Sequence, residues 1–393
     1  MRHQINTIGN SPLTWRTLCV VPLVVLMVIG CERTELPEDL KTASSTDVRV
    51  FRGGLHRAGV YAASGLAEKP GVLWRFPTGE PVHSSPVIAD RTVFMCDTSG
   101  RVFALNVEDG SIDWRYRIGD MITASPAVAG SVVLVGSQNK NLYAFDRKGG
   151  IPFWKTELEG GIRSSPAVKD GTVYVGDRGG VLHAIGLGRG DRRWRTETDG
   201  AIWSSPAVTN RRVYIGNDAH QLVAVNRETG KRIWAYNTDG KVYAAPVITK
   251  QNVVTCDLSG TIHVLNRKGE KQWTFETDGS VWSTPAVREG ILYVGSYDRH
   301  MYAFDLDSGE VIWKTELDGR IYSSPAVAGD IIYVGTYAGT LYAIDRNDGS
   351  VSWTFGTGAR IASSPLPYED RIYVGSDDGH LYTLGNRNTE QKD

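Results

Sequence analysis

The sequence contains eight similar segments, and one position in these segments carries side chains that could bind a ligand. Eight segments run from an apolar residue through a variable residue to small residues and a proline. The variable residues are, in chain order, His83, Thr123, Arg163, Trp203, Tyr243, Trp282, Tyr322 and Ala362. Four consecutive aromatic rings beside basic groups could hold an extended peptide or a planar ligand through stacking and cation–π contacts.

Three further basic residues lie two positions before a variable residue: Lys241, Arg320 and Arg360. The candidate set for binding a partner or ligand is therefore Trp203, Tyr243, Trp282, Tyr322, Arg163, Lys241, Arg320, Arg360 and His83. The same rings could instead only fill a funnel and contact their neighbours. The sequence leaves both a binding role and a packing role open.

No recognised catalytic motif accompanies this set. The sequence has no nucleophile elbow, Walker loop, dinucleotide fingerprint or haem-attachment motif. Asp-rich turns such as residues 305–309 lack the later glutamate of a calcium loop. A Ser-Ser-Pro motif recurs in most units, whereas catalysis would need one serine. We therefore expect no catalytic residue, no metal site and no cofactor.

The elements that must position these residues come from a 40-residue repeat. Within one unit, short period-two apolar segments lie at 321–327, 331–335, 341–344 and 351–355, separated by breaks rich in Gly, Asp and Asn. A tryptophan marks each of eight units: Trp74, Trp114, Trp154, Trp194, Trp234, Trp273, Trp313 and Trp353. Four short strands in each of eight units predict an all-β, eight-bladed β-propeller of four-stranded antiparallel blades.

The ends of the array predict how the ring closes. The chain enters with an outer-type strand near residues 72–77, and the last unit ends after Leu384 without one. The N-terminal strand is therefore expected to complete the eighth blade, which removes the free sheet edges. We expect a lead-in segment at 51–71, the propeller at 72–385 and a tail at 386–393.

The N-terminus predicts export and lipid attachment. Arg2 and Arg16 accompany an apolar run at 18–30, which is shorter than the roughly 20 residues that span a bilayer. The tetrapeptide at 28–31 resembles a bacterial lipobox, so residues 1–30 are a predicted lipoprotein signal peptide and Cys31 the site of acylation by chains such as palmitate. An uncleaved signal anchor is the alternative. The polar residues 31–50 suit a flexible tether.

Charge and cysteine usage limit the partners. The chain carries 43 Lys and Arg against 44 Asp and Glu, and loss of Arg2 and Arg16 makes the balance more acidic. Strong binding to nucleic acid is therefore not expected. Cys96 and Cys256 fall in the first and fifth units, half a turn apart, so they would lie on the order of 20 Å apart and cannot form a disulfide.

A motif between the third and fourth strands carries a family resemblance. It reads Ala-x-Asp/Asn-x-x-x-Gly-x-x-x-Trp, as in residues 224–234 and 303–313. It resembles the tryptophan-docking motif of propellers with pyrroloquinoline-quinone-like (PQQ-like) repeats, over roughly residues 72–385. The resemblance implies that the eight recurring tryptophans dock neighbouring blades. Gly186 replaces the acidic residue in one unit, and Val264 replaces the alanine in the unit that is one residue short.

Two kinds of protein carry such repeats. Quinoprotein dehydrogenases are longer, have an adjacent Cys-Cys pair and insert long loops, and this sequence has none of these features. The chain more closely resembles the BamB family of propeller lipoproteins in the outer-membrane β-barrel assembly machinery. That resemblance implies a non-catalytic scaffold, lipid-anchored to the outer membrane and facing the periplasm. It would be a monomeric propeller that docks protein partners of the machinery during outer-membrane protein assembly.

Two alternatives remain open. One is a quinone-binding, PQQ-dependent oxidoreductase or sensor, with Arg163, Lys241 and Trp282 near the ligand. The other is a solute- or polysaccharide-binding propeller.

Overall fold

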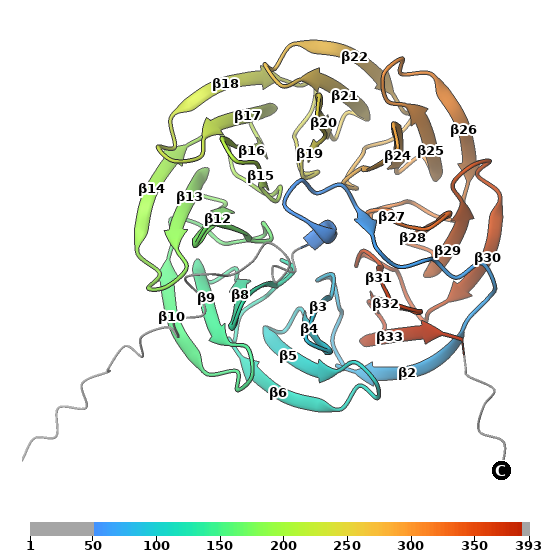
Figure 1. Cartoon of the computed structure of the whole chain (residues 1–393), viewed down its shortest axis with the longest axis horizontal. Helices are drawn as coiled ribbons and strands as arrows, with labels where there is room; N and C mark the ends of the chain where they lie inside the picture. The colour runs from blue at the N-terminus through green and yellow to red at the C-terminus, as the bar shows by residue number, and fades with distance from the viewer. Residues whose placement is uncertain (1–50, 387–393) are drawn as a thin grey trace, which may run out of the picture. The chain divides into compact units, whose positions relative to one another are not determined.

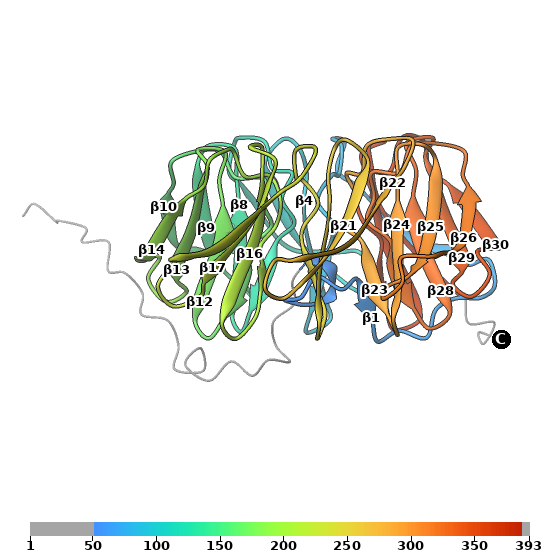
Figure 2. The same ribbon diagram turned by 90° about the horizontal axis from the view of Figure 1, so that it is seen from above.

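The computed structural model describes residues 51–386, so the predictions on the signal peptide, Cys31, the tether and the tail from residue 387 lie outside the described part. Within it, eight blades of four antiparallel strands surround a common axis, and one of these sheets gains a fifth, parallel strand (Figures 1 and 2). The only helix among these residues is a short 3₁₀ helix, η2 (Phe51–Gly53). No helix in this part of the chain is long and apolar enough to cross a membrane. The predicted eight-bladed propeller is confirmed.

Each blade runs from an inner to an outer strand. The first four blades are β3 (Val87–Ala89), β4 (Thr92–Cys96), β5 (Arg101–Asn106), β6 (Ile112–Arg117); β7 (Ala127–Ala129), β8 (Val132–Gly136), β9 (Asn141–Asp146), β10 (Pro152–Glu157); β11 (Ala167–Lys169), β12 (Thr172–Gly176), β13 (Val181–Gly186), β14 (Arg192–Glu197); and β15 (Ala207–Val208), β16 (Arg212–Asn217), β17 (Gln221–Asn226), β18 (Arg232–Asn237).

The other four blades are β19 (Val247–Ile248), β20 (Asn252–Cys256), β21 (Thr261–Asn266), β22 (Lys271–Glu276); β23 (Ala286–Arg288), β24 (Ile291–Gly295), β25 (His300–Asp305), β26 (Val311–Glu316); β27 (Ala326–Ala328), β28 (Ile331–Gly335), β29 (Thr340–Asp345), β30 (Val351–Gly356); and β31 (Leu366–Tyr368), β32 (Arg371–Ser376), β33 (His380–Gly385), β2 (Gly71–Pro77). Cys96 and Cys256 are free and buried, in blades one and five.

The inner strands are shorter than the sequence pattern indicates. We predicted a strand over 321–327, but β27 begins only at Ala326, after the proline. Proline has no N–H for a ladder, and the serines before it bond across blades instead. The backbone amide of Ser85 donates to the Ser125 hydroxyl at 2.9 Å. The link recurs at Ser125–Ser165, Ser165–Ser205, Ala245–Thr284, Thr284–Ser324, Ser324–Ser364 and Ser364–Ser85.

This chain of hydroxyl-to-amide bonds nearly encircles the axis. It is broken between Ser205 and Ala245, because alanine has no hydroxyl to accept the bond. The recurring serines thus join neighbouring blades.

The outer strands place their tryptophans against the next blade. The indole N–H of Trp114 donates to the carbonyl of Arg147 at 2.8 Å, and Trp74, Trp154, Trp194, Trp273 and Trp313 make the equivalent bond. The turn that accepts this bond needs glycine. A Cβ on Gly150, where φ is +66°, would lie 2.5 Å from the Trp114 ring. Trp234 Nε1 has no partner among the described residues, and the turn that follows it is the one shortened by a residue.

Closure of the ring follows the prediction. Strand β2 pairs antiparallel with β33, with Trp74 opposite Thr383, and so becomes the outer strand of blade eight. That blade has no continuous turn between its third and fourth strands to receive the preceding tryptophan. The indole of Trp353 instead donates to the carbonyl of Leu66, in the lead-in segment, at 2.8 Å.

The lead-in segment also lies at the centre of the ring (Figure 1), where its residues 51–61 form a plug. Carbonyls of residues 55–59 accept hydrogen bonds from the inner strands of blades four to seven, at Val208, Ile248, Val287 and Val327, over 2.8 to 3.0 Å. Strand β1 (Val60–Tyr61) then pairs parallel with β27. The plug therefore covers the inner edges of four blades.

Two arginines fix this segment, and neither pairs with an acidic side chain among residues 51–386. Both are buried, and desolvation lowers the pKa of Arg57 to about 9 and that of Arg52 to about 10. Arg57 donates to the carbonyls of Pro206 at 3.0 Å and Ser165 at 3.1 Å, and Arg52 to that of Pro285 at 2.5 Å. Carbonyls at the inner ends of the blades thus satisfy guanidinium donors from the plug.

Deletion of residues 71–78 should abolish folding. The deletion removes the outer strand of blade eight and leaves the edge of β33 unpaired. Circular dichroism should show no cooperative thermal transition. An unchanged thermal midpoint would contradict closure by this strand.

The change Arg57→Ala should destabilise the propeller by about 3 kcal/mol or more, because it leaves several buried carbonyls without a donor, each costing roughly 1–3 kcal/mol. The free energy of unfolding in denaturant measures this. The matched control Arg211→Ala removes an exposed arginine and should change stability by no more than about 0.5 kcal/mol. Equal effects of the two changes would show that the plug contributes little.

Candidate functional site

The eight variable positions meet in one pocket on the propeller axis. His83, Thr123, Arg163, Trp203, Tyr243, Trp282, Tyr322 and Ala362 all line it. They meet because every inner strand starts at the same end of the ring. Phe51, from the plug, lines the pocket as well.

The aromatic residues of blades four to seven form a continuous wall in this pocket. Trp203 and Tyr243 stack with ring centroids 4.7 Å apart and planes 15° apart. Tyr243 meets Trp282 edge-on at 5.1 Å, and Trp282 contacts Tyr322 at 5.6 Å. All four side chains are only partly buried. The sequence predicted these neighbours, because one position per blade recurs around the axis.

A second aromatic pair supports the wall and was missed from the sequence. Tyr297 stacks on Trp282 at 5.8 Å, and Tyr337 stacks on Tyr322 at 5.6 Å. The two tyrosine hydroxyls are 3.2 Å apart. Both residues occupy the same variable position in the turn between the second and third strands. That turn lies at the same end of the ring as the pocket, so comparing the repeats at this position as well would have found them.

Arg163 extends the wall with a cation. Its guanidinium lies 4.2 Å from the centroid of the Trp203 ring, and burial lowers the pKa of Arg163. Arg163 Nε and Trp203 Nε1 are both buried and have no hydrogen-bond partner among the described residues. Because neither nitrogen is exposed, a ligand in the pocket would meet the guanidinium and the ring and would reach these two donors only after neighbouring side chains move.

The other predicted basic residues do not line the pocket. Lys241 pairs with Asp218 at 3.5 Å, Arg320 lies 5.7 Å from the centroid of the Tyr297 ring, and Arg360 pairs with Asp377. His83, which does line the pocket, is 2.9 Å from the same Asp377 carboxylate. Acidic and aromatic residues of the turns between the second and third strands thus hold these groups.

Tyr243 is not suited to act as a base. Burial raises its pKa to about 12, and the hydrogen bond to Asp218 acts in the same direction. A phenol that remains protonated at neutral pH can donate a hydrogen bond to a ligand but cannot remove a proton from it.

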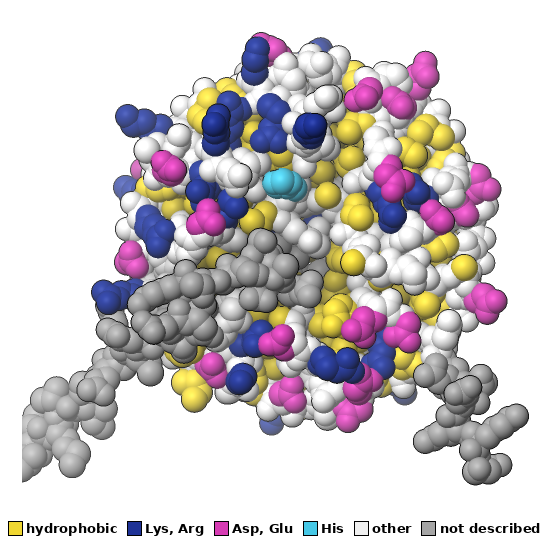
Figure 3. Space-filling model, viewed as in Figure 1, with side chains coloured by type: hydrophobic (Ala, Val, Ile, Leu, Met, Phe, Trp, Pro, Cys, Tyr) yellow, Lys and Arg dark blue, Asp and Glu magenta, His cyan; other side chains and the backbone are white. Residues whose placement is uncertain are grey.

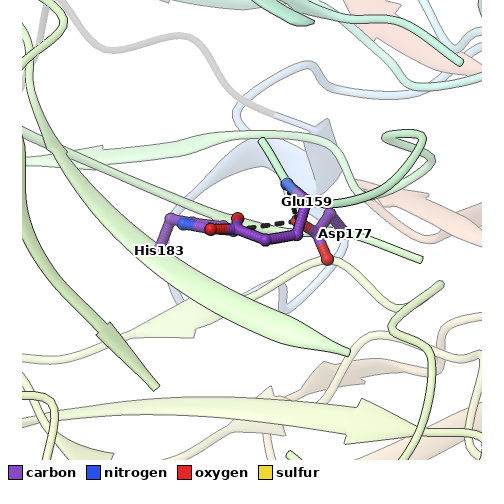
Figure 4. Close-up of side chains that lie close together, drawn as sticks. All are labelled: Glu159, Asp177 and His183. Carbon is purple, nitrogen blue, oxygen red and sulfur yellow. Dashed lines mark hydrogen bonds and ion pairs between the residues drawn. The ribbon is translucent and has the colours of Figure 1, made fainter. Parts of the chain in front are cut away.

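One cluster outside the pocket has the residue types of a metal site. His183 Nε2 lies 2.9 Å from Asp177 and 3.1 Å from Glu159, as Figure 4 shows. The carboxylate of Asp177 is already engaged, because it accepts hydrogen bonds from the backbone amides of Val181, Glu159 and Gly160. A metal ion would have to displace the hydrogen bond between His183 and Asp177.

Blade five repeats this cluster with Asp257, His263 and Asp239. His263 lies 2.9 Å from the Asp257 carboxylate, which also accepts bonds from the amides of Asp239, Gly240 and Thr261. In blade one, Asp97 anchors the same turn with Arg101 in place of histidine. The shared element is an aspartate that ties two turns together, so we interpret both clusters as turn anchors.

Stability at acid pH should depend on these anchors. Burial acts to raise the pKa of Asp257, but hydrogen bonds from His263, Ser259 and the backbone outweigh burial and hold the pKa at about 2. The stabilisation is therefore present above the usual carboxyl pKa near 4 and is lost as the pH falls towards 2. Asp257→Asn should remove roughly 2 kcal/mol of this pH dependence. Denaturant unfolding between pH 5 and pH 2 measures it, and Asp199→Asn, an exposed carboxylate, serves as control.

Comparison with known proteins identifies relatives of the fold. A family model described as the β-propeller of the beta-alanine-activating enzyme matches residues 67–290, and a model described as the outer membrane protein assembly factor BamB matches residues 258–392. A search of curated proteins finds no match.

Solved structures of two functional classes resemble the chain. BamB from Moraxella catarrhalis has a TM-score of 0.71 at 19% identity, over 80% of this chain and 99% of its own. Quinohemoprotein alcohol dehydrogenase from Comamonas testosteroni has a TM-score of 0.77 at 15% identity, over 92% of this chain and 84% of its own. A europium-containing methanol dehydrogenase has a TM-score of 0.77 at 15% identity, over 88% of this chain and 99% of its own. At these identities the likeness concerns the fold.

Proposed function

The chain belongs to the β-propeller family of the beta-alanine-activating enzyme, and from this premise we propose that it is a non-catalytic scaffold that docks a protein partner at the axial pocket. The match to BamB over the last blades and the BamB-like propeller support a role in outer-membrane protein assembly. The partner would be a protein of the barrel assembly machinery, bound as an extended segment. The combined aromatic, cationic and hydrogen-bonding lining of the pocket is the observation that supports docking.

The packing against both faces of the Trp203 ring favours a peptide over a flat ligand. Its neighbours around the axis are Arg163 on one side and Tyr243 on the other, at 4.2 and 4.7 Å. A planar ligand cannot stack on a ring whose faces are both covered. The partly exposed edge of the ring remains, beside the Arg163 cation. A ring edge beside a cation suits the apolar side chains and backbone carbonyls of a peptide.

The anchoring of the scaffold is also part of the proposal. The lipobox resemblance ending at Cys31 supports acylation of this cysteine after removal of residues 1–30, and the BamB likeness supports attachment to the outer membrane on its periplasmic side. Anchoring would raise the effective concentration of the pocket near membrane-bound partners.

A quinone-dependent activity is the second candidate, because two of the similar structures are quinohemoprotein and methanol dehydrogenases. Arg163 and Trp282 would then contact the quinone. Tyr243 would not act as a base in such a reaction, because burial raises its pKa to about 12. Titration of residues 32–393 with pyrroloquinoline quinone, followed by tryptophan fluorescence, tests this candidate directly.

The double change Trp203→Ala with Trp282→Ala should reduce capture of the partner roughly tenfold or more, since aromatic anchors carry much of the energy of such interfaces. Affinity purification of the full-length protein from detergent-solubilised membranes, with quantitative mass spectrometry of a barrel-assembly protein, measures capture. The thermal midpoint should fall by only a few degrees, because both rings are partly exposed.

Trp194→Ala provides the matched control. It removes a ring that docks two blades, so it should lower the midpoint more while leaving capture per folded molecule unchanged. A large loss of stability in the double variant would show that the aromatic wall is part of the hydrophobic core and not a binding surface. Recovery of the wild-type protein without any barrel-assembly protein, together with tight quinone binding, would favour the second candidate.

A further inference from the structure

The end of the propeller opposite the pocket has an uneven distribution of charge. This end carries the turns between first and second strands and between third and fourth strands. In blades three to five, these turns with one flanking residue on each side hold twelve Lys and Arg against four Asp and Glu. The same turns of blades six to eight hold three Lys and Arg against nine Asp and Glu. Figure 3 shows Lys and Arg side chains gathered over blades four and five.

Six residues form a continuous basic sector on this face: Lys169, Arg211, Arg212, Arg227, Lys250 and Arg267. Arg212 donates to the backbone carbonyl of Arg267, and Arg267 donates to that of Thr249 at 2.8 Å. Arg227 donates to the carbonyl of Asn210 at 2.9 Å, next to Arg211. These bonds hold the guanidinium groups of adjacent blades close together despite their like charge.

Few carboxylates neutralise the sector. Asp170 pairs with Arg227 at 2.8 Å and with Lys169 at 3.9 Å. Within residues 51–386, no ion pair is found for Arg211, Arg212, Lys250 or Arg267. Arg211 and Lys250 are also exposed. Four cations on adjacent turns therefore lack an intramolecular counter-charge within the described part of the chain.

His56 reflects the resulting positive potential. The side chain of this plug residue is exposed, and its pKa is lowered by partial desolvation first and then by the charges of Arg267 and Lys169. The positive field of the sector therefore reaches the propeller axis.

The pocket end, counted over all eight blades, is acidic, whereas the turns of the opposite end hold eighteen Lys and Arg against seventeen Asp and Glu. Counted in the same way, the turns of the pocket end hold eighteen Asp and Glu against nine Lys and Arg. A negatively charged surface is thus attracted to the basic sector and repelled by the pocket end.

The predicted anchor makes a membrane the relevant surface. Nineteen residues lie between Cys31 and Phe51, and the chain from one to the other spans at most about 70 Å when fully extended. A ring held within this distance of a bilayer repeatedly encounters its headgroups. The tether alone does not select a face, whereas the charge difference between the two ends does.

We propose that the basic sector on blades three to five binds anionic phospholipid headgroups, so that the propeller lies on the membrane with its pocket facing away. The inference rests on the proposed anchoring at Cys31 and adds an orientation to it. The pocket would then face soluble partner domains, and the sector would keep the ring from turning over.

Vesicle flotation of residues 32–393, which carry every strand of the closed ring but no acyl chain, tests the sector. Vesicles of phosphatidylcholine alone are compared with vesicles in which phosphatidylglycerol replaces about a third of the lipid, at low and at physiological salt. Arg211→Gln with Lys250→Gln should lower the partition coefficient for anionic vesicles roughly 25-fold, since each basic residue near such a surface contributes about fivefold. Binding should also weaken with salt.

The matched control is Lys140→Gln with Lys155→Gln. It removes the same charge from exposed residues at the pocket end and on an outer strand, and it should leave the partition coefficient within about twofold of wild type. Equal binding to both kinds of vesicle, equal losses in both variant pairs, or binding of the sector to an acidic protein or to nucleic acid with no vesicle binding would overturn the proposal. Failure of the anchoring itself would appear separately, as an unmodified Cys31 in mass spectrometry of the full-length protein.

Discussion

The docking of one blade onto the next is the interaction on which the rest of the structure depends. An outer-strand indole donates to a carbonyl of the following blade and lies against a glycine there. Apart from the bond that closes the ring, each such contact joins residues about 33 positions apart, so it is local enough to form between successive blades as the array assembles. Near the axis, hydrogen bonds from backbone amides to serine hydroxyls likewise join neighbouring blades. Blade geometry is therefore fixed at both the outer and the inner end.

The plug supplies what the repeats cannot. Inner strands facing the axis end in carbonyls and amides that have no further strand to pair with, and an unpaired buried group costs roughly 1–3 kcal/mol. Residues 55–59 accept the amide bonds, while Arg52 and Arg57 donate to the carbonyls. The fold tolerates two buried arginines here because the carbonyl dipoles that they face offset the repulsion between their like charges. The same segment carries Phe51 to the pocket, so channel filling and pocket shape are linked.

The charge distribution separates the two ends of the ring in a way that suits a tethered scaffold. The pocket end combines an aromatic wall with a surplus of carboxylates, and the far end has cations concentrated on three adjacent blades. The strand alternation that brings the variable residues together also keeps these two surfaces apart. A partner in the pocket and a membrane under the basic sector would therefore not compete for the same side chains.

The sequence by itself determined the blade count, the strand order, the closing strand at 72–77 and the aromatic arc from Trp203 to Tyr322, because these features repeat and equivalent positions of a ring must face the same way. It also revealed the variable position that lines the pocket. Only the tertiary structure decided that the inner strands begin after the proline, that Leu66 receives Trp353, that Tyr297 and Tyr337 support the wall, and that Arg52 and Arg57 enter the channel. The lead-in contacts occur once, between residues up to 287 positions apart. They leave no periodic signal, because they are set by the space that eight assembled blades enclose.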